Sequence, residues 1–194
     1  MEEPLEYSVY RLLKKYQYRL TTAESATGGM IASMLINVPG ISEFFQEGYV
    51  TYSDAAKVKM IHVNPRTIER FGVVSHETAA DMAASAAQTA DAQAALSVTG
   101  VAGPDGGTKE CPVGTIYIGC YLNGKTVTRH FCFSGDRMAV REAAAKEALL
   151  LLKKMLERED GYEDYSGNGK KPSIKDSSRI GYKTDDRSNQ GNTF

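Results

Sequence analysis

A serine followed by paired glycines is the first feature of the sequence that could do chemistry. Residues 21–29 read Thr-Thr-Ala-Glu-Ser-Ala-Thr-Gly-Gly and lie between a strand-like alternation and a helix-like apolar run. A helix that opens at Gly28 and Gly29 presents unpaired backbone N–H groups and the positive end of its dipole, which attract phosphate or an oxyanion. Ser25 lies just before them, where a nucleophile would be useful. The alternative is that Ser25 or Thr27 only caps the helix.

A lysine is the best candidate for activating this serine. Lys57 lies one turn inside a predicted helix that follows Tyr52 and Ser53. A lysine whose pKa is depressed can take the proton of a serine, as the histidine of a Ser-His-Asp triad does. The three histidines lie at helix ends or in an alternating strand, so a triad is poorly supported. The alternative for Lys57 is a solvated lysine on a helix surface.

A second glycine-rich stretch follows a predicted strand at 94–99. Residues 100–107 read Gly-Val-Ala-Gly-Pro-Asp-Gly-Gly, a composition that excludes regular structure. Such bare backbone can approach a ligand closely, and open α/β sheets bind ligands at the carboxyl ends of their strands. A flexible surface connection is the alternative.

Helices and strands alternate around these stretches. Apolar spacing and capping residues predict helices at 4–17, 28–36, 54–61, 65–71, 76–90 and 136–158. Strands are predicted at 18–23, 48–52 and 94–99, and at 113–122 and 125–133 around the hairpin dipeptide Asn123-Gly124. The helix at 76–90 is rich in alanine, which favours close packing, and on this basis we expect a homo-oligomer.

Composition excludes several classes of protein. The 194 residues carry a net charge of −1, which gives no electrostatic support for nucleic-acid binding. No apolar run approaches the roughly 18 residues of a membrane span, and the start, Met-Glu-Glu-Pro, is unlike a signal peptide. Three cysteines without a C-x-x-C pair argue against a disulfide framework and a zinc site. We therefore expect a cytoplasmic protein without membrane or nucleic-acid partners.

The composition changes at Glu159. From there Gly, Ser, Asn, Asp and Lys dominate, so little apolar surface is available to offset the entropy of ordering. We therefore predict one folded domain at 1–158 and a disordered polar tail at 159–194.

An ordered set of short motifs resembles the CinA C-terminal domain family over about residues 5–156. The set comprises Thr22-Ala23-Glu24-Ser25 with Thr27-Gly28-Gly29, Val38-Pro39-Gly40, Gly48-Tyr49-Val50-Thr51-Tyr52-Ser53 with Ala56-Lys57, Gly72-Val73-Val74-Ser75, residues 99–107, Pro112-Val113-Gly114-Thr115, and Gly135-Asp136-Arg137 with Val140-Arg141. Each motif is weak alone, but their order is specific. Family members known as enzymes are nicotinamide-nucleotide amidases, which hydrolyse the carboxamide of nicotinamide mononucleotide to nicotinic acid mononucleotide and ammonia.

The resemblance implies a fold and a catalytic group. The fold is α/β, a single three-layer α/β/α domain with a mixed sheet. The activity is that of an amidase that needs no metal and no cofactor. Ser25 is implied as the nucleophile and Lys57 as its base, while Tyr52 orients groups or relays protons.

The resemblance also implies how a small-molecule nucleotide substrate is bound. Thr99 and the loop 103–107 line its site, and Arg137 binds its charged portion, with Arg141 as a second possibility. Backbone N–H groups near Gly28 and Gly29, or in the loop 100–107, hold the oxyanion. The full set of candidate substrate-binding residues is Glu24, Thr27, Gly28, Gly29, Thr99, Gly103, Asp105, Gly106, Arg137 and Arg141.

The sequence departs from the family pattern in two ways. Ala26 stands where the family often has cysteine, which leaves Ser25 as the nucleophile. Many family proteins carry an additional N-terminal domain, and we expect this chain to be the stand-alone amidase form. A non-catalytic nucleotide-binding module remains the competing hypothesis, because some family proteins are known mainly by their association with DNA-uptake competence.

Overall fold

Five strands form one mixed sheet at the centre of the protein. The structure is a computed structural model, and it describes residues 3–163. The strands are β1 (Leu20–Glu24), β2 (Tyr49–Val50), β3 (Ala94–Gly100), β4 (Thr115–Leu122) and β5 (Lys125–Cys132). Their order is β2-β1-β3-β4-β5; β1 is parallel to β2 and β3, whereas β4 is antiparallel to both β3 and β5.

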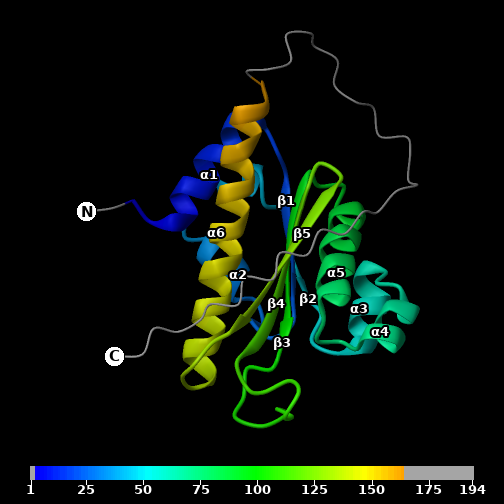
Figure 1. The fold of residues 1–194 in the computed structure, drawn as a ribbon. Helices are drawn as coiled ribbons and strands as arrows, with labels where there is room; N and C mark the ends of the chain where they lie inside the picture. The colour runs from blue at the N-terminus through cyan, green and yellow to red at the C-terminus, as the bar shows by residue number, and fades with distance from the viewer. Residues whose placement is uncertain (1–2, 164–194) are drawn as a thin grey trace.

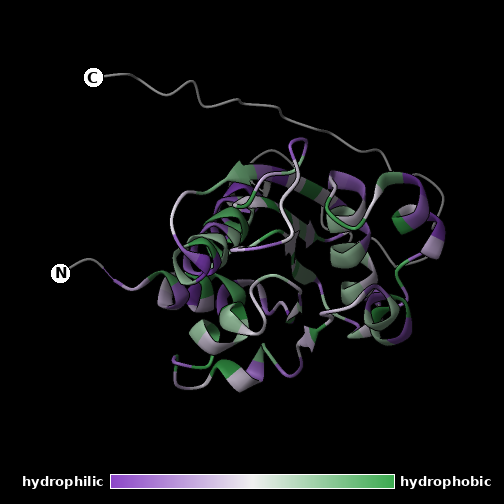
Figure 2. Ribbon diagram, turned by 90° about the horizontal axis from the view of Figure 1, so that it is seen from below, coloured by the Kyte–Doolittle hydropathy of each residue, from purple (hydrophilic) through white to green (hydrophobic). Residues whose placement is uncertain are grey.

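Helices cover both faces of this sheet (Figure 1). One layer holds α1 (Leu5–Tyr16), α2 (Met30–Leu35) and α6 (Arg137–Glu163), and the other holds α3 (Asp54–Ile61), α4 (Pro65–Phe71) and α5 (His76–Thr89). A short 3-10 helix, η1, spans Ile41–Glu43. Figure 2 shows the two helical layers from a perpendicular direction, each with hydrophobic and hydrophilic residues. The predicted three-layer α/β/α fold with a mixed sheet is therefore confirmed.

Capping side chains begin the helices of the second layer where the sequence predicts. The Ser53 hydroxyl accepts a hydrogen bond from the N–H of Ala56, and the Ser75 hydroxyl accepts one from Thr78. Asn64 caps α4 ahead of a proline at the first helical position. Each such cap contributes about 1 kcal/mol to stability, and the first of them places Lys57 one turn inside α3.

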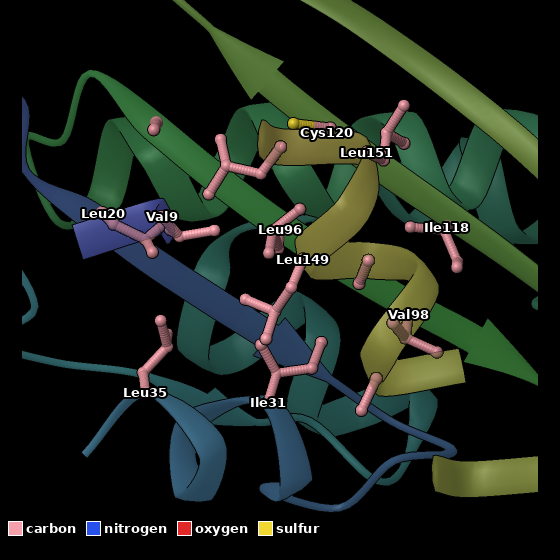
Figure 3. Close-up of a cluster of buried hydrophobic side chains, with 14 of the residues drawn as sticks. Val9, Leu20, Ile31, Leu35, Leu96, Val98, Ile118, Cys120, Leu149 and Leu151 are labelled. Atoms are coloured by element: carbon pink, nitrogen blue, oxygen red, sulfur yellow. The ribbon is translucent and has the colours of Figure 1, made fainter. Parts of the chain in front are cut away.

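The main hydrophobic core lies between the sheet and the layer of α1, α2 and α6. Figure 3 shows Leu96, Val98 and Ile118 of the sheet packed near Leu149 of α6 and Ile31 of α2, all of them fully buried. β3 contributes buried residues to both faces, and these include the polar side chains of Ser97 and Thr99.

A smaller core lies between the sheet and α5. The alanines of α5 face β3 and β4, where their small side chains allow close approach. A Cβ at Gly119 of β4 would collide with the Ala79 carbonyl oxygen of α5 and with the Ser97 hydroxyl. The alanine-rich face of α5 therefore packs against the sheet of its own domain. The expected homo-oligomer stays a prediction, and it draws no support from this helix.

Several element bounds differ from those predicted. β1 runs from Leu20 to Glu24 rather than over 18–23, and β2 holds two residues rather than five because Ser53 already caps α3. α2 begins at Met30 rather than at residue 28, since both preceding glycines have positive φ. α6 continues to Glu163 rather than ending at 158, and the division into a domain at 1–158 and a tail at 159–194 stays a prediction. The rest of the predicted tail, 164–194, lies outside the described residues.

Within residues 3–163, no helix is both long enough and apolar enough to cross a membrane.

The close contact at Gly119 predicts a stability effect. We expect Gly119→Ala to lower the free energy of unfolding by about 1–3 kcal/mol, because the added methyl group overpacks the interface of β4 and α5. Urea denaturation measures the change. Glu142→Ala, on an exposed site of α6, is the control and should change stability by less than about 0.5 kcal/mol. Equal stability of both variants would show that α5 can shift without cost.

Candidate active site

Ser25 lies in a tight turn directly after β1. Its N–H donates to the carbonyl of Val98 in β3 at 2.9 Å, and its own carbonyl accepts from the N–H of Gly28 at 3.1 Å. The positive φ values of Gly28 (60°) and Gly29 (94°) allow the chain to turn from the strand into α2. The backbone of Ser25 is thus held at both its N–H and its carbonyl, and its side chain reaches a cavity.

Lys57 is buried beside this serine. Its side chain is 1% exposed, and its Nζ lies 3.3 Å from the Ser25 Oγ and 3.0 Å from the carbonyl oxygen of Thr51. Burial lowers the pKa of Lys57 below its ordinary value, while the Asp54 carboxylate, 3.8 Å away, opposes this shift. The solvated helix lysine considered as an alternative is therefore wrong. A larger fraction of neutral amine is available at the serine than an exposed lysine would supply.

A cavity of about 250 Å³ opens at the carboxyl ends of β1 and β3. This is the edge where parallel strands place ligand sites. Its lining includes five residues that the sequence singled out, namely Ser25, Tyr52, Lys57, Thr99 and Arg137. It also includes Ala26, Asp54, Val73, Val74, Gly100 and Ala102.

Arg137 joins three parts of the cavity rim. From the first position of α6 its guanidinium donates to the Tyr52 hydroxyl at 2.8 Å and to the carbonyl of Gly103 at 2.5 Å. Gly103 itself must be glycine, because a Cβ there would lie 2.5 Å from the Val113 side chain. Tyr52 remains 62% exposed, so the ring and the arginine together form the outer wall of the site.

Glu24 has a different role from the one expected. It is 1% exposed, and its carboxylate accepts hydrogen bonds from the N–H groups of Gly29 (2.9 Å), Ile31 (3.0 Å) and Ala32 (2.9 Å). The start of α2 is thus already occupied by an internal anion. These contacts give no support to the prediction that N–H groups around Gly28 and Gly29 receive a phosphate or oxyanion, which stays a prediction. Glu24 likewise caps α2 and does not line the cavity.

Thr27 and Arg141 are tied to each other. The Arg141 guanidinium donates to the carbonyl of Thr27 through Nε (3.3 Å) and Nη2 (2.8 Å), and it lies against Gly28. The Thr27 hydroxyl is buried and has no hydrogen-bond partner in the part of the chain that the structure describes. Neither residue lines the cavity. Arg141 as a phosphate ligand therefore stays a prediction, without support from the cavity geometry.

The residues of the second glycine-rich stretch divide into two groups. Thr99 lines the cavity, and its hydroxyl donates to the carbonyl of Val73 at 2.8 Å. This hydrogen bond holds Val73, another residue of the cavity lining, in place. Asp105 and Gly106 lie in the exposed part of the loop, outside the cavity lining. Contact of these two residues with a substrate remains a prediction.

Asp54 is the residue that sequence reasoning missed. It lines the cavity, and its Oδ1 lies 3.8 Å from Lys57 Nζ. The signal that could have found it is its spacing: residues three apart on a helix share a face. An acid at this spacing from a proposed lysine base is itself a candidate for the site.

The capping role of Glu24 predicts a stability effect. We expect Glu24→Gln to lower the free energy of unfolding by about 1–3 kcal/mol, since one amide oxygen replaces two charged acceptors at the start of α2. Urea denaturation gives the value, and Glu43→Gln, at an exposed glutamate, is the control. If stability is unchanged and ligand binding is lost, Glu24 contacts the substrate rather than stabilising α2.

Comparison with known proteins identifies the family of the chain. Residues 2–156 match the family described as the CinA C-terminal domain. A CinA-like protein of Kosmotoga olearia is 47% identical over 155 residues, which are 80% of this chain but 38% of that protein, so the chain spans well under half of its relative.

Solved structures of similar proteins share the fold. A CinA superfamily protein from Klebsiella pneumoniae has a TM-score of 0.76 at 34% identity, covering 79% of this chain and 96% of its own. A competence or damage-inducible protein from Enterobacter asburiae has a TM-score of 0.75 at 38% identity, covering 78% and 96%. The chain therefore belongs to the CinA C-terminal domain family.

Proposed function

We propose that this protein is a nicotinamide-nucleotide amidase, which hydrolyses the carboxamide of nicotinamide mononucleotide to nicotinic acid mononucleotide and ammonia. The observation that carries the proposal is the distance of 3.3 Å between Ser25 Oγ and the Nζ of a fully buried lysine, both of them lining one cavity. A neutral amine next to a hydroxyl is the Ser-Lys arrangement for cleaving an acyl bond.

Lys57 acts first as a base. In its neutral form it accepts the proton of Ser25 while Oγ attacks the carboxamide carbon and forms a tetrahedral intermediate. The carbonyl of Thr51, 3.0 Å from Nζ, fixes the direction of the amine and leaves its lone pair free for the serine. Proximity of this kind replaces a bimolecular proton transfer by an internal one.

The protonated lysine then acts as an acid. It delivers its proton to the leaving nitrogen, so that ammonia departs and an ester with Ser25 remains. Water attacks this ester while Lys57 again accepts a proton. Lys57 then gives this proton to Ser25 Oγ as the bond to the acyl carbon breaks, so that the acid product leaves and both residues are restored. Tyr52, whose hydroxyl is held by Arg137, is the second group able to pass a proton at the rim.

Two backbone stretches compete for the oxyanion, and the structure favours one. Because Glu24 already accepts from the start of α2, the donors are assigned to the stretch that includes Gly100 and Ala102, which lines the cavity. One oxyanion donor typically lowers the rate-limiting barrier by about 3–4 kcal/mol. Arg137 is assigned to the substrate phosphate, because a guanidinium pairs with phosphate oxygens through two parallel hydrogen bonds.

The nucleophile can be tested directly. We expect purified protein to release ammonia from nicotinamide mononucleotide and Ser25→Ala to reduce the rate at least about 1,000-fold with unchanged thermal unfolding. Ser33→Ala, at an exposed site of α2, is the matched control and should keep full activity. No release by the wild type, with mononucleotide still bound, would favour the non-catalytic binding module.

The base can be tested through pH. Only neutral Lys57 can accept the proton, so the wild-type rate should fall as pH decreases through its pKa, and this fall should lie below the range of an ordinary lysine. Lys57→Met should lose activity at every pH and keep or gain stability, because no charge is then buried. Lys59→Met, at an exposed site of the same helix, should behave as wild type. An active Lys57→Met variant would assign the base elsewhere.

A further inference from the structure

The charges of the cavity are few and unevenly placed. Among the described residues that line it, the charged side chains are Asp54, Lys57 and Arg137. Asp54 and Lys57 lie one helical turn apart on α3, with Oδ1 and Nζ 3.8 Å apart. Arg137 reaches the cavity from α6, where it donates hydrogen bonds to the Tyr52 hydroxyl and the Gly103 carbonyl.

The working state of the site leaves Asp54 without a counter-charge. As a base, Lys57 must be neutral, so the Asp54 carboxylate then faces an uncharged amine. Asp54 is 59% exposed, which gives it access to a ligand in the cavity. The site then carries one negative charge beside the reacting groups and one positive charge at the rim.

We infer that Asp54 is a specificity-determining residue that pairs with a cationic ring bearing the scissile carboxamide, so that the site selects an N-substituted pyridinium carboxamide over its neutral, reduced form. The inference rests on the proposed amidase function of the same cavity. The proposed function specifies the carboxamide bond that is cleaved. This inference adds the charge of the ring to which the carboxamide is attached.

The geometry places the ring close to Asp54. The carboxamide carbon must come within about 3–3.5 Å of Ser25 Oγ to be attacked. The ring is bonded directly to that carbon, and the neighbouring amine of Lys57 is itself 3.8 Å from the carboxylate. A ring cation at this place is therefore near an opposite charge, and because Asp54 is 59% exposed, water partly screens the attraction between them.

The same arrangement suits the other end of such a molecule. A mononucleotide carries its phosphate one ribose away from the ring, and Arg137 lies at the rim of the cavity rather than beside Ser25 and Lys57. A substrate with a cation near the reacting bond and an anion beyond it matches Asp54 and Arg137 in order. Pairing of the ring with Asp54 also removes the counter-ion of protonated Lys57 and so favours the neutral base.

A purely structural role for Asp54 is the alternative. Acidic residues stabilise the first turn of a helix, and Asp54 is the first residue of α3. That role would make stability depend on Asp54 but would not distinguish two ligands of the same shape. Ser53 caps the helix with its own hydroxyl, so replacement of Asp54 by the isosteric asparagine should leave α3 in place.

The test compares two ligands that differ in ring charge. Calorimetry measures binding of nicotinamide mononucleotide and of its reduced dihydro form to Ser25→Ala protein, which cannot turn them over. With Asp54 present, we expect the cationic form to bind at least about tenfold more tightly. Asp54→Asn in the same background should bring the ratio close to one, while Asp54→Glu, which keeps the charge, should retain most of the preference.

The controls separate this inference from the proposed function. Glu69→Gln removes one negative charge from an exposed site of α4 outside the cavity lining and should leave the ratio unchanged. A ratio near one with Asp54 present, a ratio unaffected by Asp54→Asn, or no binding of either ligand overturns the inference. Failure of the wild type to release ammonia overturns the proposed function instead, because the binding ratio does not depend on turnover.

Discussion

The burial of Lys57 against Ser25 is the constraint on which the rest of the site depends. Removing an amine from water is unfavourable for its charged form, and this same cost supplies a neutral base near the serine. The surrounding elements make the burial possible. Ser53 begins α3 at the right residue, Thr51 offers a carbonyl to Nζ, and α5 closes the layer behind α3.

A second buried charge, Glu24, determines the shape of the loop that carries the serine. Its carboxylate satisfies three N–H groups at the start of α2, so the turn between β1 and α2 is held from inside the protein. The two glycine-rich stretches therefore have different roles. The first positions Ser25, and the second lines the cavity through Gly100 and Ala102.

Local signals in the sequence predicted most of the fold and singled out Ser25 and Lys57, which the structure brings together. Ser53, Asn64 and Ser75 cap helices through residues two or three positions ahead, and Asn123-Gly124 closes a hairpin between adjacent strands. The contacts that the sequence did not predict are those in which a long side chain reaches across a turn. The contact of Glu24 with Ala32 depends on two glycines with positive φ, and that of Arg141 with Thr27 joins α6 to a distant loop, so neither follows from spacing alone.

The charges of the site bear on the choice between an amidase and a binding module. Asp54 and Arg137 would serve either function, because both can hold a ligand that carries a cation and an anion. Lys57 would not, because a binder gains nothing from an amine that is 1% exposed and hydrogen-bonded to a backbone carbonyl. An apolar residue of similar length would remove the desolvation cost at the same place. A lysine retained there in spite of that cost is accounted for by proton transfer with Ser25, and this favours catalysis.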